Sequence, residues 1–153
     1  MNTQKLPDFI ALYRAWENLK SGPTAEMRRV ATPDELMNLP VFYRLVSPFG
    51  WVSGMKPWDK ERWARLVFLM EHITPGGENS LGKSLAITSK VNEKRLFQIV
   101  RADSPNDIVQ LRRILKQAQP KVNWTKMAEQ IWYWNPRNKR NLLEDFVLNV
   151  KDK

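Results

Sequence analysis

Apolar residues recur at helical spacing between positions 89 and 120, and this periodicity constrains the fold more than any other feature of the chain. Asn92 begins the first predicted helix, with a side chain able to cap free backbone N–H groups. The sequence Ser104-Pro105-Asn106-Asp107 begins the second, with a Ser cap, Pro in the first turn and an acid three residues after the cap. Pro120 ends it. The residues predicted to be buried are Leu96, Phe97, Ile99, Val100, Ile108, Leu111 and Leu115.

Lysine and arginine residues occupy the remaining faces of these two predicted helices, where Lys94 and Arg101 lie two turns apart and nearly in line. The set comprises Lys94, Arg95, Arg101, Arg112, Arg113 and Lys116. A rigid surface with so many cations is typical of proteins that bind a polyanion. We therefore interpret these six residues as a candidate nucleic-acid-binding surface. The acids Glu93, Asp103 and Asp107 are close enough in sequence to pair with part of it.

A second cationic candidate, Arg28-Arg29, lies on a short predicted helix between two proline-containing turns. The functional interpretation is a phosphate clamp, because the guanidinium group is always charged and makes two parallel hydrogen bonds to a phosphate. The structural alternative is a solvated helix face on which one arginine pairs with Glu26 or Glu35. The sequence leaves both interpretations open.

The charge of the whole chain favours the same class of partner. Its formal net charge is +9, from 25 Lys and Arg against 16 Asp and Glu. The excess is concentrated in residues 77–153, with 15 Lys and Arg against 8 Asp and Glu, whereas residues 1–76 carry 10 against 8. This balance favours nucleic acid, with an anionic membrane surface as the weaker alternative.

The absence of cysteine excludes disulfides, thiolate zinc sites and cysteine nucleophiles. The first residues lack the basic start and apolar core of a signal peptide. No apolar run approaches the ~20 residues that a membrane span needs. We therefore expect a soluble protein of the cytoplasm that makes no contact with a membrane.

Helical periodicity continues through the rest of the chain, and no segment alternates with a period of two. We predict an all-α protein with about eight helices and no β-sheet. The Gly- and Pro-rich segment 74–79 coincides with the rise in charge and marks a candidate boundary. We expect two small helical bundles, at residues 1–75 and 90–153, joined by a linker and short helix at 76–89. The alternative is that both halves share one core.

Some finer expectations concern helix ends and apolar faces. Gly22-Pro23 is expected to close the first helix and Thr24 to cap the next one, and Asn123 is expected to cap the helix that follows Pro120. Val147 and Val150 extend the apolar stripe of the last predicted helix, so we expect both to be buried.

Catalytic patterns are poorly represented in the sequence. His72 is the only histidine, and one histidine makes neither a metal site nor an acid–base pair. Asp34-Glu35 suits the first turn of a helix, and the adjacent Glu144-Asp145 diverge on a helix instead of converging on one ion. Gly-rich phosphate loops and Ser nucleophile motifs are absent. We therefore expect no enzymatic activity, no cofactor and no metal.

The seven tryptophans offer a further means of binding nucleic acid, because single-strand binders stack bases on aromatic rings. Four of them fall on apolar stripes and are predicted to lie in the core: Trp16, Trp63, Trp124 and Trp132. The positions of Trp51, Trp58 and Trp134 leave base stacking open.

The sequence resembles the CasB family, the small subunits of the type I-E CRISPR surveillance complex Cascade. The resemblance spans nearly the whole chain and is weakest from Val52 to Lys90. It rests on seven ordered blocks: ALYRAW (11–16), RRV (28–30), PDEL (33–36), FYRLV with PFGW (42–51), NEKRLFQIVRAD (92–103), VQLRRIL (109–115) and LLEDFVL (142–148).

The resemblance implies an all-α, non-enzymatic subunit of two helical bundles. Two copies are expected head to tail against the crRNA-loaded backbone subunits and the large subunit. The basic surface is implicated in holding the opened target DNA and its displaced strand. Arg28, Arg29 and the six cations of the predicted helix pair are the positions to which the resemblance assigns this task.

Two alternatives of other classes remain open at this point. A standalone basic helical protein would bind DNA or RNA strongly when purified alone. A pure protein scaffold would direct the same cations at acidic faces of neighbouring subunits. A nuclease is a further alternative, which a cleavage assay with Mg²⁺ tests.

Overall fold

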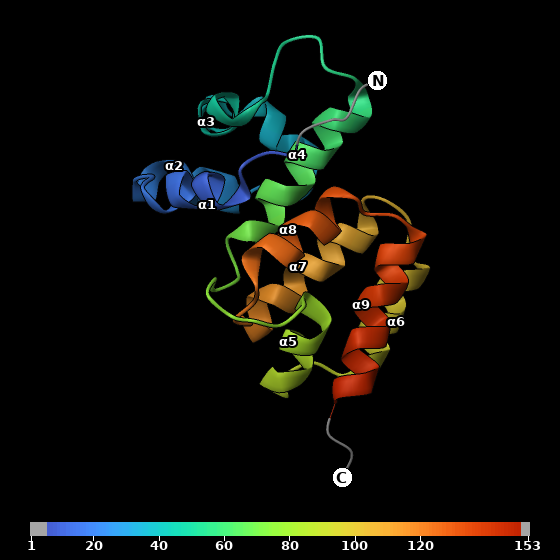
Figure 1. The fold of residues 1–153 in the computed structure, drawn as a ribbon. Coiled ribbons are helices and arrows are strands. Elements are labelled where there is room, and N and C mark those ends of the chain that lie inside the picture. Colours follow the sequence, from blue (N-terminus) through green and yellow to red (C-terminus); the bar gives the residue numbers. More distant parts are fainter. Residues whose placement is uncertain (1–5, 151–153) are drawn as a thin grey trace.

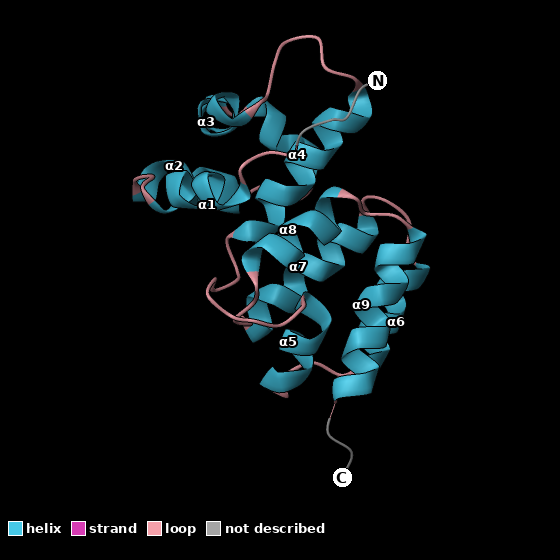
Figure 2. Cartoon of the chain, viewed as in Figure 1, coloured by secondary structure: helices cyan, strands magenta, loops and turns pink. Residues whose placement is uncertain are grey.

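The computed structural model describes residues 6–150 and confirms the all-α prediction (Figure 2). Within this range the chain forms nine α-helices and two 3₁₀-helices, with no strand beyond an isolated bridge between Thr74 and Lys121. The elements are α1 (Phe9–Glu17), α2 (Ser21–Arg28), η1 (Pro33–Asn38), α3 (Pro40–Val46), η2 (Ser47–Phe49), α4 (Pro57–Met70), α5 (Leu81–Thr88), α6 (Glu93–Arg101), α7 (Asn106–Ala118), α8 (Trp124–Trp132) and α9 (Pro136–Asn149). None of these helices combines the length and the apolar character needed to cross a membrane.

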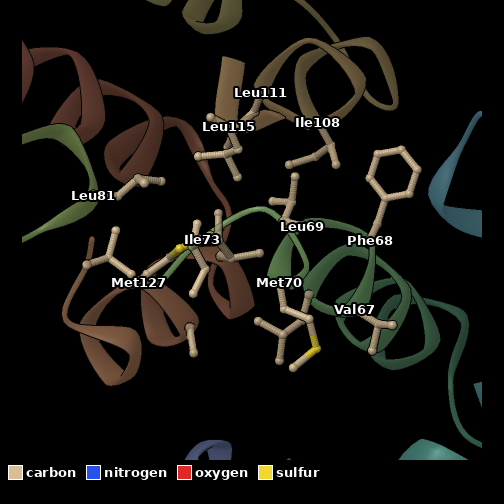
Figure 3. Close-up of a cluster of buried hydrophobic side chains, with 14 of the residues drawn as sticks. Val67, Phe68, Leu69, Met70, Ile73, Leu81, Ile108, Leu111, Leu115 and Met127 are labelled. Atoms are coloured by element: carbon tan, nitrogen blue, oxygen red, sulfur yellow. The ribbon is translucent and has the colours of Figure 1, made fainter. Parts of the chain in front are cut away.

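The helices fall into two groups joined through the centre of the molecule. Figure 1 shows α1, α2 and α3 beside α4, and α5, α6 and α9 at the opposite end, with α7 and α8 between them. Buried side chains from both groups belong to one hydrophobic cluster, among them Leu12 of α1, Leu66 of α4, Leu111 of α7, Met127 of α8 and Phe146 of α9. Figure 3 shows part of this cluster, where α4, α7 and α8 meet. One core therefore connects the two predicted bundles, whose boundary at 76–89 stays a prediction.

The Gly- and Pro-rich segment between α4 and α5 is tied to the loop before α8. The Thr74 N–H donates to the carbonyl of Pro120, and the Thr74 carbonyl accepts from the Val122 N–H, both at 2.9 Å. The Gly77 N–H donates to the carbonyl of Val122, also at 2.9 Å. A Cβ on Gly77 would lie 2.8 Å from the carbonyl oxygen of Lys121. The glycine content of this segment indicates a linker, but in the structure Gly77 allows two backbone segments to approach closely.

A second glycine allows α5 to pack closely against α9. A Cβ on Gly82 would lie 2.5 Å from the carbonyl oxygen of Leu142 and 2.8 Å from the Cβ of Asp145. Helix α9 also packs along α6, where the Lys139 ammonium donates to the Ala102 carbonyl at 2.7 Å. These contacts fix the position of α6, which carries part of the candidate site.

Helix caps follow the predictions at α6 and α8. The side chain of Asn92 accepts from the Arg95 N–H, and that of Asn123 accepts from the Lys126 N–H. The predicted Ser104 cap of α7 is wrong, because α7 begins at Asn106. Asp107 is instead buried, where it accepts from the Trp134 indole at 2.9 Å and pairs with an ammonium group of α9.

Four other local expectations are wrong. Gly22-Pro23 lies inside the first turn of α2, and the Thr24 hydroxyl donates to the carbonyls of Lys20 and Ser21 in place of capping. Val147 and Val150 are exposed, because α9 directs Leu142 and Phe146 into the core instead. Phe97, predicted to be buried, lies on the exposed side of α6.

Candidate nucleic-acid interface

A hollow of about 290 Å³ lies where the C-terminal ends of α2 and α4 approach α7. We call it the α2–α7 groove. Four of its eight lining residues are lysine or arginine, and Phe68 supplies an aromatic wall that extends from α4 beside Ile108 (Figure 3). The lining residues are Arg28, Ala31, Phe68, His72, Val109, Arg112, Arg113 and Lys116. Helices distant in sequence therefore converge on a concavity in which half of the lining residues are lysine or arginine.

A second hollow, of about 270 Å³, lies between α6 and α7. We call it the α6–α7 groove, and its lining residues are Arg95, Gln98, Gln110, Arg113 and Ile114. Arg113 lines both grooves, so the two hollows adjoin along the outer side of α7. The cations of the two grooves form one set, which we call the basic track: Arg28, Arg95, Arg112, Arg113 and Lys116.

Arg112 is the structural member of the basic track. Its guanidinium donates to the carbonyls of Arg28 and Val30, both at 2.6 Å, and lies 4.1 Å from the ring centroid of Phe68. These carbonyls lie at the C-terminal end of α2, where a helix leaves carbonyl groups unsatisfied and favours a cation. The side chain is 13% exposed, and burial lowers its pKa against the opposing charge of Glu71. Arg112 therefore attaches α2 to α7 and presents few donors to a ligand.

Glu71 is the acidic partner of two cations that line the α2–α7 groove, Arg28 and Arg112. Its side chain is 6% exposed, pairs with the Nε of Arg28 and lies 3.1 Å from the Nε2 of His72. Burial alone raises the pKa of Glu71, but the hydrogen bonds and charges of His72 and Arg28 outweigh it and hold the pKa below its usual value. The carboxylate is therefore ionised at neutral pH. Arg28 thus pairs with a residue of α4's C-terminal end, not with Glu26 or Glu35 as the structural alternative expected.

The outer members of the basic track, Arg113 and Lys116, have no partner among the described residues. Among residues 6–150, the side chains of Arg113 and Lys116 make no hydrogen bond or ion pair, and both are exposed one turn apart on α7. Arg29 is likewise exposed and unpaired within this range, just after α2. Arg28 keeps 55% of its side chain exposed despite its ion pair. Arg95 donates to the side chain of Gln117 at the edge of the α6–α7 groove.

The two remaining predicted residues do not line the grooves and lie on the exposed face of α6. Lys94 is exposed, and its side chain makes no hydrogen bond or ion pair within residues 6–150. The guanidinium of Arg101 lies 5.5 Å from the ring centroid of Phe97. Of the eight predicted residues, five therefore line the grooves and three flank them, and their binding of nucleic acid stays a prediction.

Other residues that line the grooves or pair with their cations were not predicted as site residues. Phe68, Glu71 and His72 come from α4 and the turn after it, and only the packing of α4 on α7 brings them to the cations. The grooves' glutamines, Gln98 and Gln110, occupy ordinary polar helix positions. Helical spacing predicts which side of α6 and α7 is polar, but it gives no information about which other helix lies beside it.

The three tryptophans that the sequence left open differ in exposure. Trp51 packs edge-on against Phe42 at 5.4 Å, and Trp134 donates to Asp107. Trp58 is exposed, with the Lys56 ammonium 6.0 Å from its ring centroid. The described part of the chain contains no group of three or more histidine or acidic residues placed to hold a metal ion.

Comparisons with known proteins give a consistent result. The family model of the CRISPR-associated protein Cse2 matches residues 24–146. The Cascade subunit CasB of Escherichia coli strain K12 is 44% identical over 154 residues, covering 94% of each chain.

Solved structures agree with this match. A chain in the crystal structure of E. coli Cascade bound to a PAM-containing dsDNA target has a TM-score of 0.87 and 42% identity, over 95% of this chain and 100% of that one. CasB from Thermus thermophilus has a TM-score of 0.66 at 14% identity, over 91% and 95%, and so supports the fold alone. The resemblance inferred from the sequence blocks is confirmed, and the chain belongs to the CRISPR-associated Cse2 family, which includes CasB.

Proposed function

We propose that this chain is a non-catalytic subunit of a type I-E Cascade complex, in which it binds nucleic acid and stabilises the crRNA-guided R-loop. Its partners in this proposal are the crRNA-loaded backbone subunits, the large subunit, a second copy of itself, and the target and displaced DNA strands. Two comparisons support the assignment: the E. coli relative is a Cascade subunit, and the structure with the TM-score of 0.87 is Cascade bound to dsDNA.

The observation that carries the proposal is the pair of adjoining grooves with their unpaired outer cations. Arg113 and Lys116 are exposed and make no ion pair within residues 6–150, and Arg113 lines both grooves. Guanidinium and ammonium groups in such a track bind phosphates irrespective of base sequence. Contacts that ignore sequence suit this role, because the guide RNA supplies the specificity.

Modest contacts suffice for such a function. R-loop formation exchanges a DNA duplex for an RNA–DNA hybrid of similar stability, so a few phosphate contacts decide which state is favoured. A displaced strand that is held on the protein is not free to reanneal. We expect the isolated subunit to bind weakly, since it offers only a few contacts. Assembly strengthens the binding, because a tethered second site acts at a high effective concentration.

The proposal is tested by the lifetime of matched dsDNA on assembled complexes. One set carries Arg113→Glu/Lys116→Glu, and the control carries Lys83→Glu/Lys126→Glu, which reverses two exposed cations of α5 and α8 outside both grooves. With all subunits retained, we expect the groove variant to release DNA faster and the control to match the wild type. An unchanged lifetime contradicts the proposal. If the groove variant drops out of the complex, these cations contact protein, and the scaffold alternative is favoured.

A further inference from the structure

Phe97 is the exposed phenylalanine of the chain. All six phenylalanines lie within residues 6–150, and five of them are buried or half-buried, whereas Phe97 is 47% exposed in the middle of α6. Phenylalanine is also a weaker helix former than leucine or lysine, so the helix itself gains nothing from it. A single exposed apolar residue needs no explanation. The surroundings of this one suggest a function.

Cations flank the ring on the same face of α6. Lys94 precedes Phe97 by three residues and Arg101 follows it by four, so all three side chains are neighbours on the helix surface. The Arg101 guanidinium lies 5.5 Å from the ring centroid. Lys94 makes no ion pair or hydrogen bond within residues 6–150. An aromatic ring between two cations matches the chemistry of a nucleotide, which combines a flat base with an anionic phosphate.

The ring is also close to the basic track along the chain and the helix. Gln98, the next residue, lines the α6–α7 groove together with Arg95 and Arg113. Helix α6 therefore contributes one flank to the groove and presents Phe97 on its outer side. A strand whose phosphates lie on the basic track needs to extend only across the surface of α6 to reach the ring.

We propose that Phe97 and Arg101 form a stacking site for an unpaired base, with Lys94 beside the adjoining phosphate. This inference rests on the proposed function and adds that the strand is held by a base as well as by phosphates. Bases stack on aromatic rings and on guanidinium planes, and every base has a π-face, so the contact is independent of sequence. A duplex hides the faces of its bases, so the site discriminates between single-stranded and double-stranded nucleic acid.

The test compares two single-stranded probes at low ionic strength by fluorescence anisotropy with the full-length protein. One probe is oligothymidylate, and the other is an abasic deoxyribose-phosphate oligomer of equal length. Phe97→Leu removes the ring but keeps an apolar, helix-favouring side chain. We expect it to weaken thymidylate binding about 5-fold or more and to leave abasic binding and its salt dependence unchanged. Phe97→Trp keeps an aromatic ring at this position, so we expect it to bind oligothymidylate as tightly as the wild type does.

Two results overturn the inference: thymidylate binding that Phe97→Leu leaves unchanged, or an equal loss on both probes. The variant Arg113→Glu/Lys116→Glu shows whether the stacking site alone is wrong or the proposed function is wrong as well. If that variant binds both probes as the wild type does, the basic track does not bind nucleic acid and both proposals fail. If it loses both probes while Phe97→Leu loses neither, the proposed function stands and the stacking site does not. A wild-type chain that binds neither probe contradicts both proposals.

Discussion

The two sides of the α2–α7 groove use the same residue type in opposite ways. On the inner side, Arg112 is largely buried, and its donors are taken by two carbonyls at the end of α2. On the outer side, Arg113 is exposed and makes no hydrogen bond or ion pair within residues 6–150. Neighbouring helix positions lie about 100° apart around the axis. That rotation places one guanidinium against the protein and its neighbour in solvent.

The difference shows that a cationic sequence block is not one functional unit. The inner side builds the groove, because Arg112 and Glu71 fix the ends of α2 and α4 against α7. The outer side is available for a ligand. Arg28 belongs partly to each, since its Nε pairs with Glu71 while much of its side chain is exposed. Changes on the two sides should therefore have separable effects on stability and on binding.

The largest effect should come from removing the inner arginine. Arg112→Met leaves two carbonyls without their donor and removes a partner of the buried Glu71. We expect the free energy of unfolding to fall by about 2–4 kcal/mol, measured by urea denaturation. The matched control Arg113→Met should change it by less than about 0.5 kcal/mol. Equal losses in the two variants would show that the inner and outer sides do not differ.

The next effect concerns the outer cations and appears in the dependence of binding on salt. For the full-length protein on single-stranded DNA, each lost phosphate contact should lower the slope of log affinity against log salt by ~0.7. The double variant Arg113→Ala/Lys116→Ala should therefore lower the slope by ~1.4. The control Lys83→Ala/Lys126→Ala should keep the wild-type slope. A double variant with the wild-type slope would exclude both side chains from the phosphate-binding surface.

The smallest effect should come from Glu71, the acid that pairs with Arg28. Glu71→Gln removes the negative charge that faces Arg28, so an incoming phosphate meets less repulsion and a freer guanidinium. We expect affinity for single-stranded DNA to rise by roughly 0.5–1 kcal/mol at low salt and less at high salt. Competition titrations against labelled DNA measure this change. A fall in affinity would indicate that Glu71 is needed to orient Arg28 for binding.

The same substitution should change how stability depends on pH. The pKa of Glu71 is lowered in the folded protein, so its ionised form contributes stability that is fully present above the unfolded-state pKa, about 4.3. That contribution is lost as the pH falls through the folded-state pKa, which lies lower. Urea denaturation across this range should therefore show a shallower acid loss for Glu71→Gln than for the wild type. If the stability of the two proteins fell in parallel with pH, Glu71 would have the same pKa in the folded and unfolded states.

Much of the fold follows from local sequence signals. Asn92 and Asn123 cap their helices as predicted, because the cap needs only a side-chain oxygen and the nearby N–H groups. The segment 74–79 shows the limit of such local signals. Its glycines and prolines indicate a free linker, but Gly77 serves a close contact with a loop more than 40 residues away in sequence. Local composition does not reveal such a partner.

The candidate site was predictable only in part. Helical spacing placed Arg113 and Lys116 on the polar side of α7, and both are exposed there. Arg112 was placed on the same side, but its partners are backbone carbonyls, which carry no residue-type signal. Glu71 reaches Arg28 and Arg112 through the packing of α4 on α7, so its role follows from tertiary structure alone. The exposure of Phe97 was not predicted, because an apolar residue beside an apolar stripe indicates burial.

The central claim is that the outer cations of the basic track hold the displaced strand. Permanganate footprinting of that strand tests it most directly, because the reagent oxidises unpaired thymines. Matched targets are bound by complexes with the wild-type chain, with Arg113→Glu/Lys116→Glu, or with Lys83→Glu/Lys126→Glu, after each complex is shown to retain its subunits. We predict a persistent open strand for the wild type and the control, and faster closure for the groove variant. An open strand of equal lifetime in all three intact complexes would contradict the claim.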